Sequence, residues 1–319
     1  MAHANYQDLM PFQMENLLPV LPTPVQDVPE GIALLAINII LWSNMNIFKD
    51  KVVWITGGSS GIGKALAFEL LSSGATVVLF ARNIANLNAA KEELIKSTAC
   101  QPDQVTFLSL DVTDFEQIQQ TIPIFLSDHP VPDLLINCAG SAHPGEFLDL
   151  GLDIFHWLMN SNYYGTVHMI KTLLPYMLEI GSGHIVNISS AAGFLGVYGY
   201  TAYCASKFAV RGFSDALRSE LLLKNIKMSL VFPPDTDTPQ LAYESDFKPA
   251  ITKALAGNAG ILSPSYVAKS ILKGIKREKY IIVPGLENAF FYHLSNFLGS
   301  NVYWLMDFMV KSAAKKGTH

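Results

Sequence analysis

A glycine-rich turn between an apolar strand and a helix most constrains how this chain can fold. The run Lys51–Thr56 is rich in β-forming residues, and the helix-period segment Lys64–Leu71 follows the turn. Glycines allow a tight turn and close approach of a pyrophosphate, and a helix N-terminus presents free N–H groups to phosphates. This context predicts a phosphate site, with an ordinary strand-to-helix turn as the alternative. The residues expected to contact the phosphates are Gly57, Ser59, Ser60, Gly61, Ile62 and Gly63.

Strands and helices alternate along the rest of this region. The later expected strands are Thr76–Phe80, Val105–Leu110, Asp133–Asn137, Gly183–Ser189, Lys227–Phe232 and Tyr280–Val283. The expected helices between them are Ile84–Thr98, Asp114–Asp128, Leu152–Ile180 and Ser263–Arg277. This alternation predicts an α/β fold, a doubly wound (Rossmann) sheet of about seven parallel strands with helices on both faces.

The residue that follows the second expected strand bears on the choice of nucleotide. A free ribose 2′-hydroxyl would favour an acidic residue there, whereas this chain has Arg82. A planar guanidinium suits a 2′-phosphate and can stack on adenine, so Arg82 indicates NADP(H) over NAD(H). The alternative is an ordinary surface arginine.

Two further strand ends carry residues suited to the same cofactor. Asp111 and Val112 follow the third strand, where a carboxylate could meet the adenine amino group. Asn137 ends the fourth strand, and the small residues Ala139 and Gly140 come soon after it. Beside such small residues a ring could lie flat.

Tyr203 and Lys207 form the candidate catalytic pair. They stand four residues apart at the start of a helix-period segment, so they would share one helix face. An ammonium beside a phenol stabilises the phenolate, and we therefore expect the pKa of Tyr203 to be lowered toward neutrality. A tyrosine of that kind can transfer a proton at working pH. The alternative is a surface lysine near a packed tyrosine.

Two polar positions upstream of this pair are further candidates. Ser190 follows the fifth strand, beyond whose carboxyl end a ligand would bind, and Ser189 is the competing assignment by one residue. Asn162 falls near the middle of a long expected helix, where asparagine is mildly unfavourable, so it has reason to be there beyond helix formation.

In order and spacing, these residues resemble the short-chain dehydrogenase/reductase superfamily over roughly residues 49–285. The motifs that carry the resemblance are Thr56-Gly57-x-x-x-Gly61-x-Gly63, Asn137-Cys138-Ala139-Gly140, Asn162, Ser190 and Tyr203-x-x-x-Lys207. The resemblance implies that Tyr203 donates a proton, Lys207 lowers its pKa and holds the nicotinamide ribose, and Ser190 orients a carbonyl. It also implies that Asn162 holds a water linking Lys207 to solvent. Two residues after the sixth strand complete the implied cofactor site: Pro233 and Thr236.

A narrower resemblance lies in Phe232–Pro239 and Tyr200–Gly212, which are similar to the 3-ketodihydrosphingosine reductase family. It implies NADPH-dependent reduction of 3-ketosphinganine, in the cytoplasm or at the cytoplasmic face of a membrane, the endoplasmic reticulum in a eukaryote. One alternative is a short-chain reductase of another lipophilic carbonyl or alcohol, such as a steroid, a retinoid or a fatty acyl ketone. The remote alternative is a non-catalytic NADP-sensing protein, which the intact Tyr203 and Lys207 disfavour.

Extensions flank the expected domain, which spans residues 49–285 with a candidate substrate loop at 234–262. In the N-terminal extension, 1–48, the apolar segment Gly31–Trp42 is short for a span of about 20 residues, so it would pack on protein or anchor monotopically. The tail 286–319 is apolar and aromatic and ends in lysines, as in a helix lying on a membrane surface. Its alternative is a helix covering the sheet or a dimer interface.

Charge and cysteine content limit the kinds of partner that this chain is expected to bind. A net charge of −5 without a basic block argues against nucleic acid. Three scattered cysteines lack metal-type or paired spacing, which is typical of reduced, buried thiols, and we expect no metal site. We expect a lipophilic small-molecule substrate, a membrane surface as partner, and a homo-oligomer, because pairing through two long helices is common in the superfamily that the chain resembles.

Overall fold

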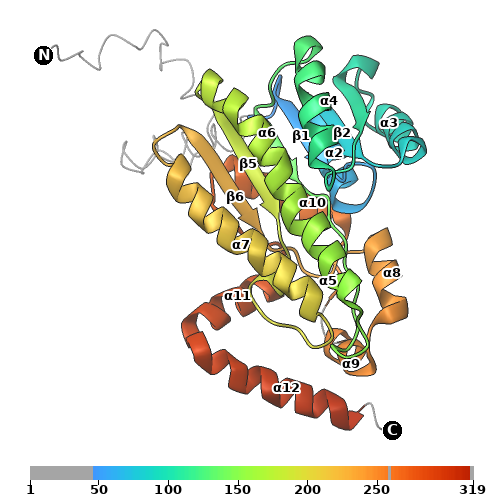
Figure 1. Ribbon diagram of the computed structural model, residues 1–319, viewed down its shortest axis with the longest axis vertical. Coiled ribbons are helices and arrows are strands. Elements are labelled where there is room, and N and C mark those ends of the chain that lie inside the picture. The colour runs from blue at the N-terminus through green and yellow to red at the C-terminus, as the bar shows by residue number, and fades with distance from the viewer. Residues whose placement is uncertain (1–45, 258–259, 317–319) are drawn as a thin grey trace, which may run out of the picture. The chain divides into compact units, whose positions relative to one another are not determined.

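The computed structural model describes residues 46–257 and 260–316, and nearly all of the expected N-terminal extension, including Gly31–Trp42, lies outside them. Within the described part, seven strands form one parallel sheet in the order β3-β2-β1-β4-β5-β6-β7 (Figure 1). They are β1 (Val52–Thr56), β2 (Thr76–Ala81), β3 (Val105–Ser109), β4 (Leu134–Asn137), β5 (Gly183–Ile188), β6 (Ile226–Val231) and β7 (Ile281–Ile282). The expected fold class is confirmed.

Helices cover both faces of the sheet because alternate strand residues point to opposite sides. On one face pack α2 (Gly61–Ser72), α3 (Ile84–Thr98) and α10 (Pro264–Lys276). On the other pack α4 (Phe115–Asp128), α6 (Gly165–Ile180) and α7 (Thr201–Leu221). In β1, Val53 and Ile55 enter the first core and Trp54 the second. Pairing of two copies through the long helices stays a prediction.

The strand order reverses beside β1, which pairs with β2 on one side and β4 on the other. In open parallel sheets a ligand crevice forms at this reversal, outside the carboxyl ends of the strands. The turn after β1 and the segments after β4, β5 and β6 therefore meet at one edge.

The helix expected over Leu152–Ile180 is interrupted. It consists of α5 (Leu152–Leu158), a π-helical segment Met159–Tyr164, and then α6. Asn162 lies in the π-helical segment with 1% of its surface exposed. A π segment inserts an extra residue into the helical turn, and such segments are frequent at functional sites.

The candidate substrate loop contains two helices that the sequence pattern did not indicate, α8 (Pro239–Phe247) and α9 (Ala250–Ala256). Thr238 caps α8 by accepting a hydrogen bond from the Leu241 amide at 3.3 Å. The two ends of the loop meet at a parallel bridge between Thr236 and Leu262. The Asp237 amide donates to the Leu262 carbonyl at 2.9 Å, which closes the loop at its base.

The C-terminal tail forms two helices, α11 (Leu286–Leu298) and α12 (Val302–Lys316), joined by the 3₁₀ turn Gly299–Asn301. Gly299 has a φ of 54°, a conformation that favours glycine. The red helices in Figure 1 run past α9, and α12 packs against it. Among the residues described, none of the helices combines the length and the apolar character needed to cross a membrane. The remaining 3₁₀ turns are Pro102–Gln104 and Ala191–Gly193.

Candidate active site

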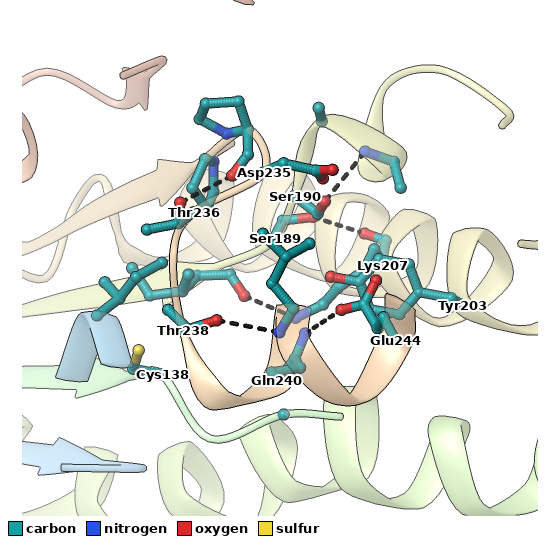
Figure 2. Close-up of a pocket in the computed structure, with 18 of the residues that line it drawn as sticks. Cys138, Ser189, Ser190, Tyr203, Lys207, Asp235, Thr236, Thr238, Gln240 and Glu244 are labelled. Atoms are coloured by element: carbon teal, nitrogen blue, oxygen red, sulfur yellow. Dashed lines mark hydrogen bonds between the residues drawn. The ribbon is translucent and has the colours of Figure 1, made fainter. Parts of the chain in front are cut away.

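A pocket of about 250 Å³ lies where the carboxyl ends of β1, β4, β5 and β6 meet (Figure 2). It brings together most of the residues that the sequence indicated. Those lining it are Gly57, Ser60, Ile62, Gly63, Ala139, Gly140, Ser189, Ser190, Tyr203, Lys207, Pro233 and Thr236.

The turn after β1 has the geometry of a phosphate cradle. A Cβ on Gly63 would lie 2.3 Å from the Gly57 carbonyl oxygen, and one on Gly57 would lie 2.9 Å from the Ala139 backbone, so neither position admits a side chain. Ser60 precedes α2 without a side-chain cap, and the first turn of α2 holds no acidic residue. The uncapped N–H groups and the positive helix end fit the phosphates of a dinucleotide.

Lys207 and Tyr203 lie one turn apart on α7, with 5% and 8% of their surfaces exposed. The Lys207 ammonium donates to the Ile188 carbonyl at 3.1 Å and lies 5.7 Å from the centroid of the Tyr203 ring. Burial lowers the pKa of Lys207 to about 8. The lysine is therefore charged at neutral pH and loses its proton under mildly alkaline conditions.

The expectation of a lowered pKa for Tyr203 is wrong. Desolvation raises the pKa of Tyr203 above its ordinary value, and the nearby Glu244 carboxylate raises it further. The nearby Ser190 side chain lowers the pKa of Tyr203, but only in part. The sequence argument had no measure of this burial, nor of an acidic neighbour from a distant helix. Tyr203 consequently retains its proton at neutral pH, as a proton donor requires.

The geometry separates the two candidate serines. The Ser189 hydroxyl is buried and donates to the Lys207 carbonyl at 3.0 Å, so it joins β5 to α7. The Ser190 Oγ instead accepts from the Ala192 amide at 3.2 Å, and the Ser190 side chain is close enough to Tyr203 to lower its pKa. Of the two, Ser190 is the one placed to bind an oxygen beside Tyr203.

Asn162 holds the loop after β4 against α7. Its Oδ1 accepts from the Ser141 amide at 2.7 Å, and its Nδ2 donates to the Ser206 hydroxyl at 2.8 Å. A Cβ on Gly140 would lie 2.7 Å from Asn162 Oδ1 and 3.3 Å from Lys207 Nζ, so a glycine lets these groups approach. The water that Asn162 is expected to hold stays a prediction.

Several expected cofactor residues do not line this pocket: Ser59, Gly61, Arg82, Asp111, Val112 and Asn137. Asn137 is buried and donates to Asn187 Oδ1 at 2.9 Å, an internal link between β4 and β5. Asp111 accepts from the amide and the hydroxyl of Thr113, each at 2.9 Å. Arg82 is exposed directly after β2. Arg82 follows β2 and Asp111 follows β3. These two strands lie on one side of β1, whereas β4, β5 and β6 lie on the other.

Sequence reasoning missed a polar group on α8 that faces the catalytic pocket. Glu244 is 6% exposed, and its carboxylate accepts from the Tyr200 hydroxyl at 2.6 Å and from Gln240 Nε2 at 3.0 Å. The signal that could have found it is Thr238-Pro239, a helix start of the same type as Ser263-Pro264 before α10. That start places positions 240 and 244 on one helix face.

An apolar cavity of about 570 Å³ adjoins the catalytic pocket. The residues common to the two linings are Ala191, Val197, Tyr200, Pro234 and Asp235. Its walls come from α9, α11 and α12, which contribute mostly aliphatic, aromatic and methionine side chains. Those from α11 and α12 include Phe291, Leu294, Val302, Leu305, Met306 and Met309. One face of the tail helices therefore extends the pocket away from Tyr203.

Comparison with known proteins agrees with this geometry. Residues 51–248 match the short chain dehydrogenase family. The chain is 40% identical to a 3-ketodihydrosphingosine reductase of Bos taurus over 222 residues, 69% of this chain and 67% of that one. It is 40% identical to a Dictyostelium discoideum protein of the same name over 248 residues, 73% and 74% of the two chains. A short-chain dehydrogenase from Sphingobium yanoikuyae in complex with NADPH superposes with a TM-score of 0.66 at 26% identity, covering 81% of this chain and 96% of that one.

The low pKa of Lys207 is directly measurable. In protein labelled at the lysine side chains, we expect one resonance to titrate at about pH 8, because burial disfavours the charged form. This resonance should be missing in Lys207→Met and present in Lys311→Met, which changes an exposed lysine. A Lys207 resonance that titrates above pH 10 would contradict the assignment.

Proposed function

Because this chain belongs to the short-chain dehydrogenase family, and is therefore an oxidoreductase, we propose that it reduces 3-ketosphinganine to sphinganine with NADPH. The observation that best supports this choice of substrate is the apolar cavity beside the catalytic pocket. Its volume lies within the range of roughly 300–1,000 Å³ usual for ligand sites. Two relatives named as reductases of this ketone support the same choice.

The two pockets divide the substrate between them. The ketone lies at Tyr203 and Ser190, and the hydrocarbon chain passes Tyr200 into the cavity between α9 and α12. Each buried methylene contributes about 0.8 kcal/mol to binding. A long chain thereby holds the ketone in position, and a short ketone loses that contribution.

The catalytic residues act on the ketone oxygen. Ser190 and Tyr203 donate hydrogen bonds to it, which polarises the carbonyl. When bound, the reduced nicotinamide supplies the hydride that the carbonyl carbon receives. The alkoxide that develops takes the proton from Tyr203, whose raised pKa has kept that proton available. The Lys207 ammonium stabilises the tyrosinate left behind, since an opposite charge favours the ionised form.

Preference for NADPH rests on Arg82. The Gly57 amide donates to the Phe80 carbonyl at 2.8 Å, so the end of β2 lies against the phosphate turn. Arg82 follows two residues later, with an exposed guanidinium and the neutral Asn83 beside it. A cation at that strand end binds a 2′-phosphate, whereas a carboxylate would bind the hydroxyl of NADH.

We further propose that the tail rests on the cytoplasmic face of an anionic membrane, the endoplasmic reticulum in a eukaryotic cell. Trp304 and Phe308 are 76% and 63% exposed and lie at helical spacing with Lys311 and Lys315. The opposite face of α12 lines the cavity. Aromatic residues followed by lysines suit a helix at the headgroup level of an anionic leaflet.

Chain length should control the rate of reduction. Oxidation of NADPH by the purified protein is followed with 3-ketosphinganine, with shorter-chain homologues and with a steroid ketone. We expect kcat/KM to fall roughly fourfold for each methylene removed, since each contributes about 0.8 kcal/mol. Leu294→Trp fills the cavity and should shift the preference toward shorter chains, whereas Phe297→Trp, 87% exposed on the same helix, should not. A faster reaction with the steroid would overturn the proposed substrate.

Replacing Arg82 should change the choice of nucleotide. Arg82→Asp removes the partner of the 2′-phosphate, so kcat/KM for NADPH should fall relative to NADH by about 10- to 100-fold, the value of a charged hydrogen bond. Lys96→Asp makes the same charge change at an exposed site on α3 and should leave the ratio as it was. An unaltered ratio in Arg82→Asp would assign the phosphate to another residue.

Membrane contact can be tested by sedimentation with phosphatidylcholine vesicles, with and without phosphatidylserine. The double variant Trp304→Ser, Phe308→Ser should lower the bound fraction on both vesicles. Lys311→Gln with Lys315→Gln should lower it only on the anionic ones, because each lysine near such a surface is worth about 1 kcal/mol. Phe147→Ser, an equally exposed phenylalanine before α5, is the control. Equal binding by all variants would remove the tail as the contact.

A further inference from the structure

Glu244 presents a buried carboxylate inside the catalytic pocket. It comes from α8, and its carboxylate lies beside Tyr203 and Lys207 in Figure 2. Tyr200 connects it to the catalytic tyrosine. The Tyr200 hydroxyl donates to Glu244 Oε2 at 2.6 Å, and the Tyr200 and Tyr203 ring centroids are 5.7 Å apart.

This carboxylate lacks a cationic partner among the described residues. None of their ion pairs includes Glu244, and Lys248, the nearby lysine of the same segment, pairs with Asp235 at 3.1 Å. The Lys207 ammonium donates to the Ile188 carbonyl and interacts with the Glu244 charge without forming a direct ion pair with it. A buried charge is costly unless it is paired, and two neutral donors leave acceptor positions of the carboxylate open. Among the described residues, Glu244 therefore lacks a direct cationic contact, and the ammonium of a bound ligand could supply one.

We infer that Glu244 binds the ammonium group of an α-amino ketone. The inference rests on the proposed function, because in that substrate an amino group stands on the carbon next to the ketone. With the ketone oxygen at Ser190 and Tyr203, the neighbouring ammonium reaches toward α8 and its carboxylate. Glu244 thus makes the enzyme selective for an amino ketone over a neutral ketone of equal length.

The same ion pair couples substrate recognition to proton transfer. In the free protein the Glu244 carboxylate is one cause of the raised pKa of Tyr203. A bound ammonium offsets that negative charge and favours the ionised form of a nearby phenol. The amino ketone therefore makes Tyr203 a better proton donor, whereas a neutral ketone leaves the field of Glu244 unchanged.

The test compares two ketones in three proteins. The ketones are 3-ketosphinganine and its deamino analogue, which keeps the hydroxyl, the ketone and the chain. Glu244→Gln removes the charge at nearly constant shape, and we expect the ratio of kcat/KM, amino over deamino, to fall about 10- to 100-fold. Tyr200→Phe loosens α8 but keeps the carboxylate, so it should slow both ketones and preserve the ratio. Binding of NADPH, followed by fluorescence, verifies that each variant is folded.

Each outcome decides a different point. A ratio that stays constant in Glu244→Gln, with both ketones slowed alike, would make Glu244 a structural link to Tyr200 and overturn the ammonium site alone. Failure of the unaltered protein to reduce either ketone, with NADPH bound, would overturn the proposed function and the ammonium site with it. A wild-type enzyme that prefers the deamino ketone would also exclude the site.

Discussion

Burial of the Lys207 ammonium at the end of β5 is the constraint on which the rest of the site depends. A charge removed from water needs strong partners, and the Ile188 carbonyl supplies one at 3.1 Å only because α7 lies against that strand. The Ser189 hydroxyl donates to the Lys207 carbonyl and holds the same two elements together from the other side. With α7 fixed in this way, Tyr203, one turn earlier, lines the pocket together with Ser190.

Local patterns were sufficient for the sheet and for part of the pocket lining, including Ser190, Tyr203 and Lys207. The parallel strands and the phosphate turn follow from period, glycines and the alternation of strands with helices, and the start of α10 follows from Ser263 and its proline. The direction of the Tyr203 pKa shift could not be obtained in this way. It depends on how deeply α7 is covered and on Glu244, which belongs to a helix far along the chain. A Tyr-x-x-x-Lys pattern gives no information about the burial of α7 or about the position of Glu244.

The substrate side was the least predictable part because it is built from short segments that are weak by themselves. Helices α8 and α9 are each too short to show a clear period, and α11 and α12 are apolar on more than one face. Only their packing distinguishes the α12 side chains that line the cavity, such as Leu305, from exposed ones such as Trp304. The sequence therefore predicted a tail that lies on a membrane surface. It did not predict that the same tail lines the apolar cavity.

The bridge between Thr236 and Leu262 has a consequence for how such enzymes diversify. Because the bridge joins the two ends of this segment, the segment forms a loop whose ends lie at the same place. The entropy cost of closing a loop grows only logarithmically, by about 0.6 kcal/mol for each doubling of length. Insertions in this segment therefore cost little free energy of folding, provided that the contact between Glu244 and Tyr200 is kept. A change in this segment can therefore alter the substrate range without altering the strand and the helix that hold Ser190, Tyr203 and Lys207.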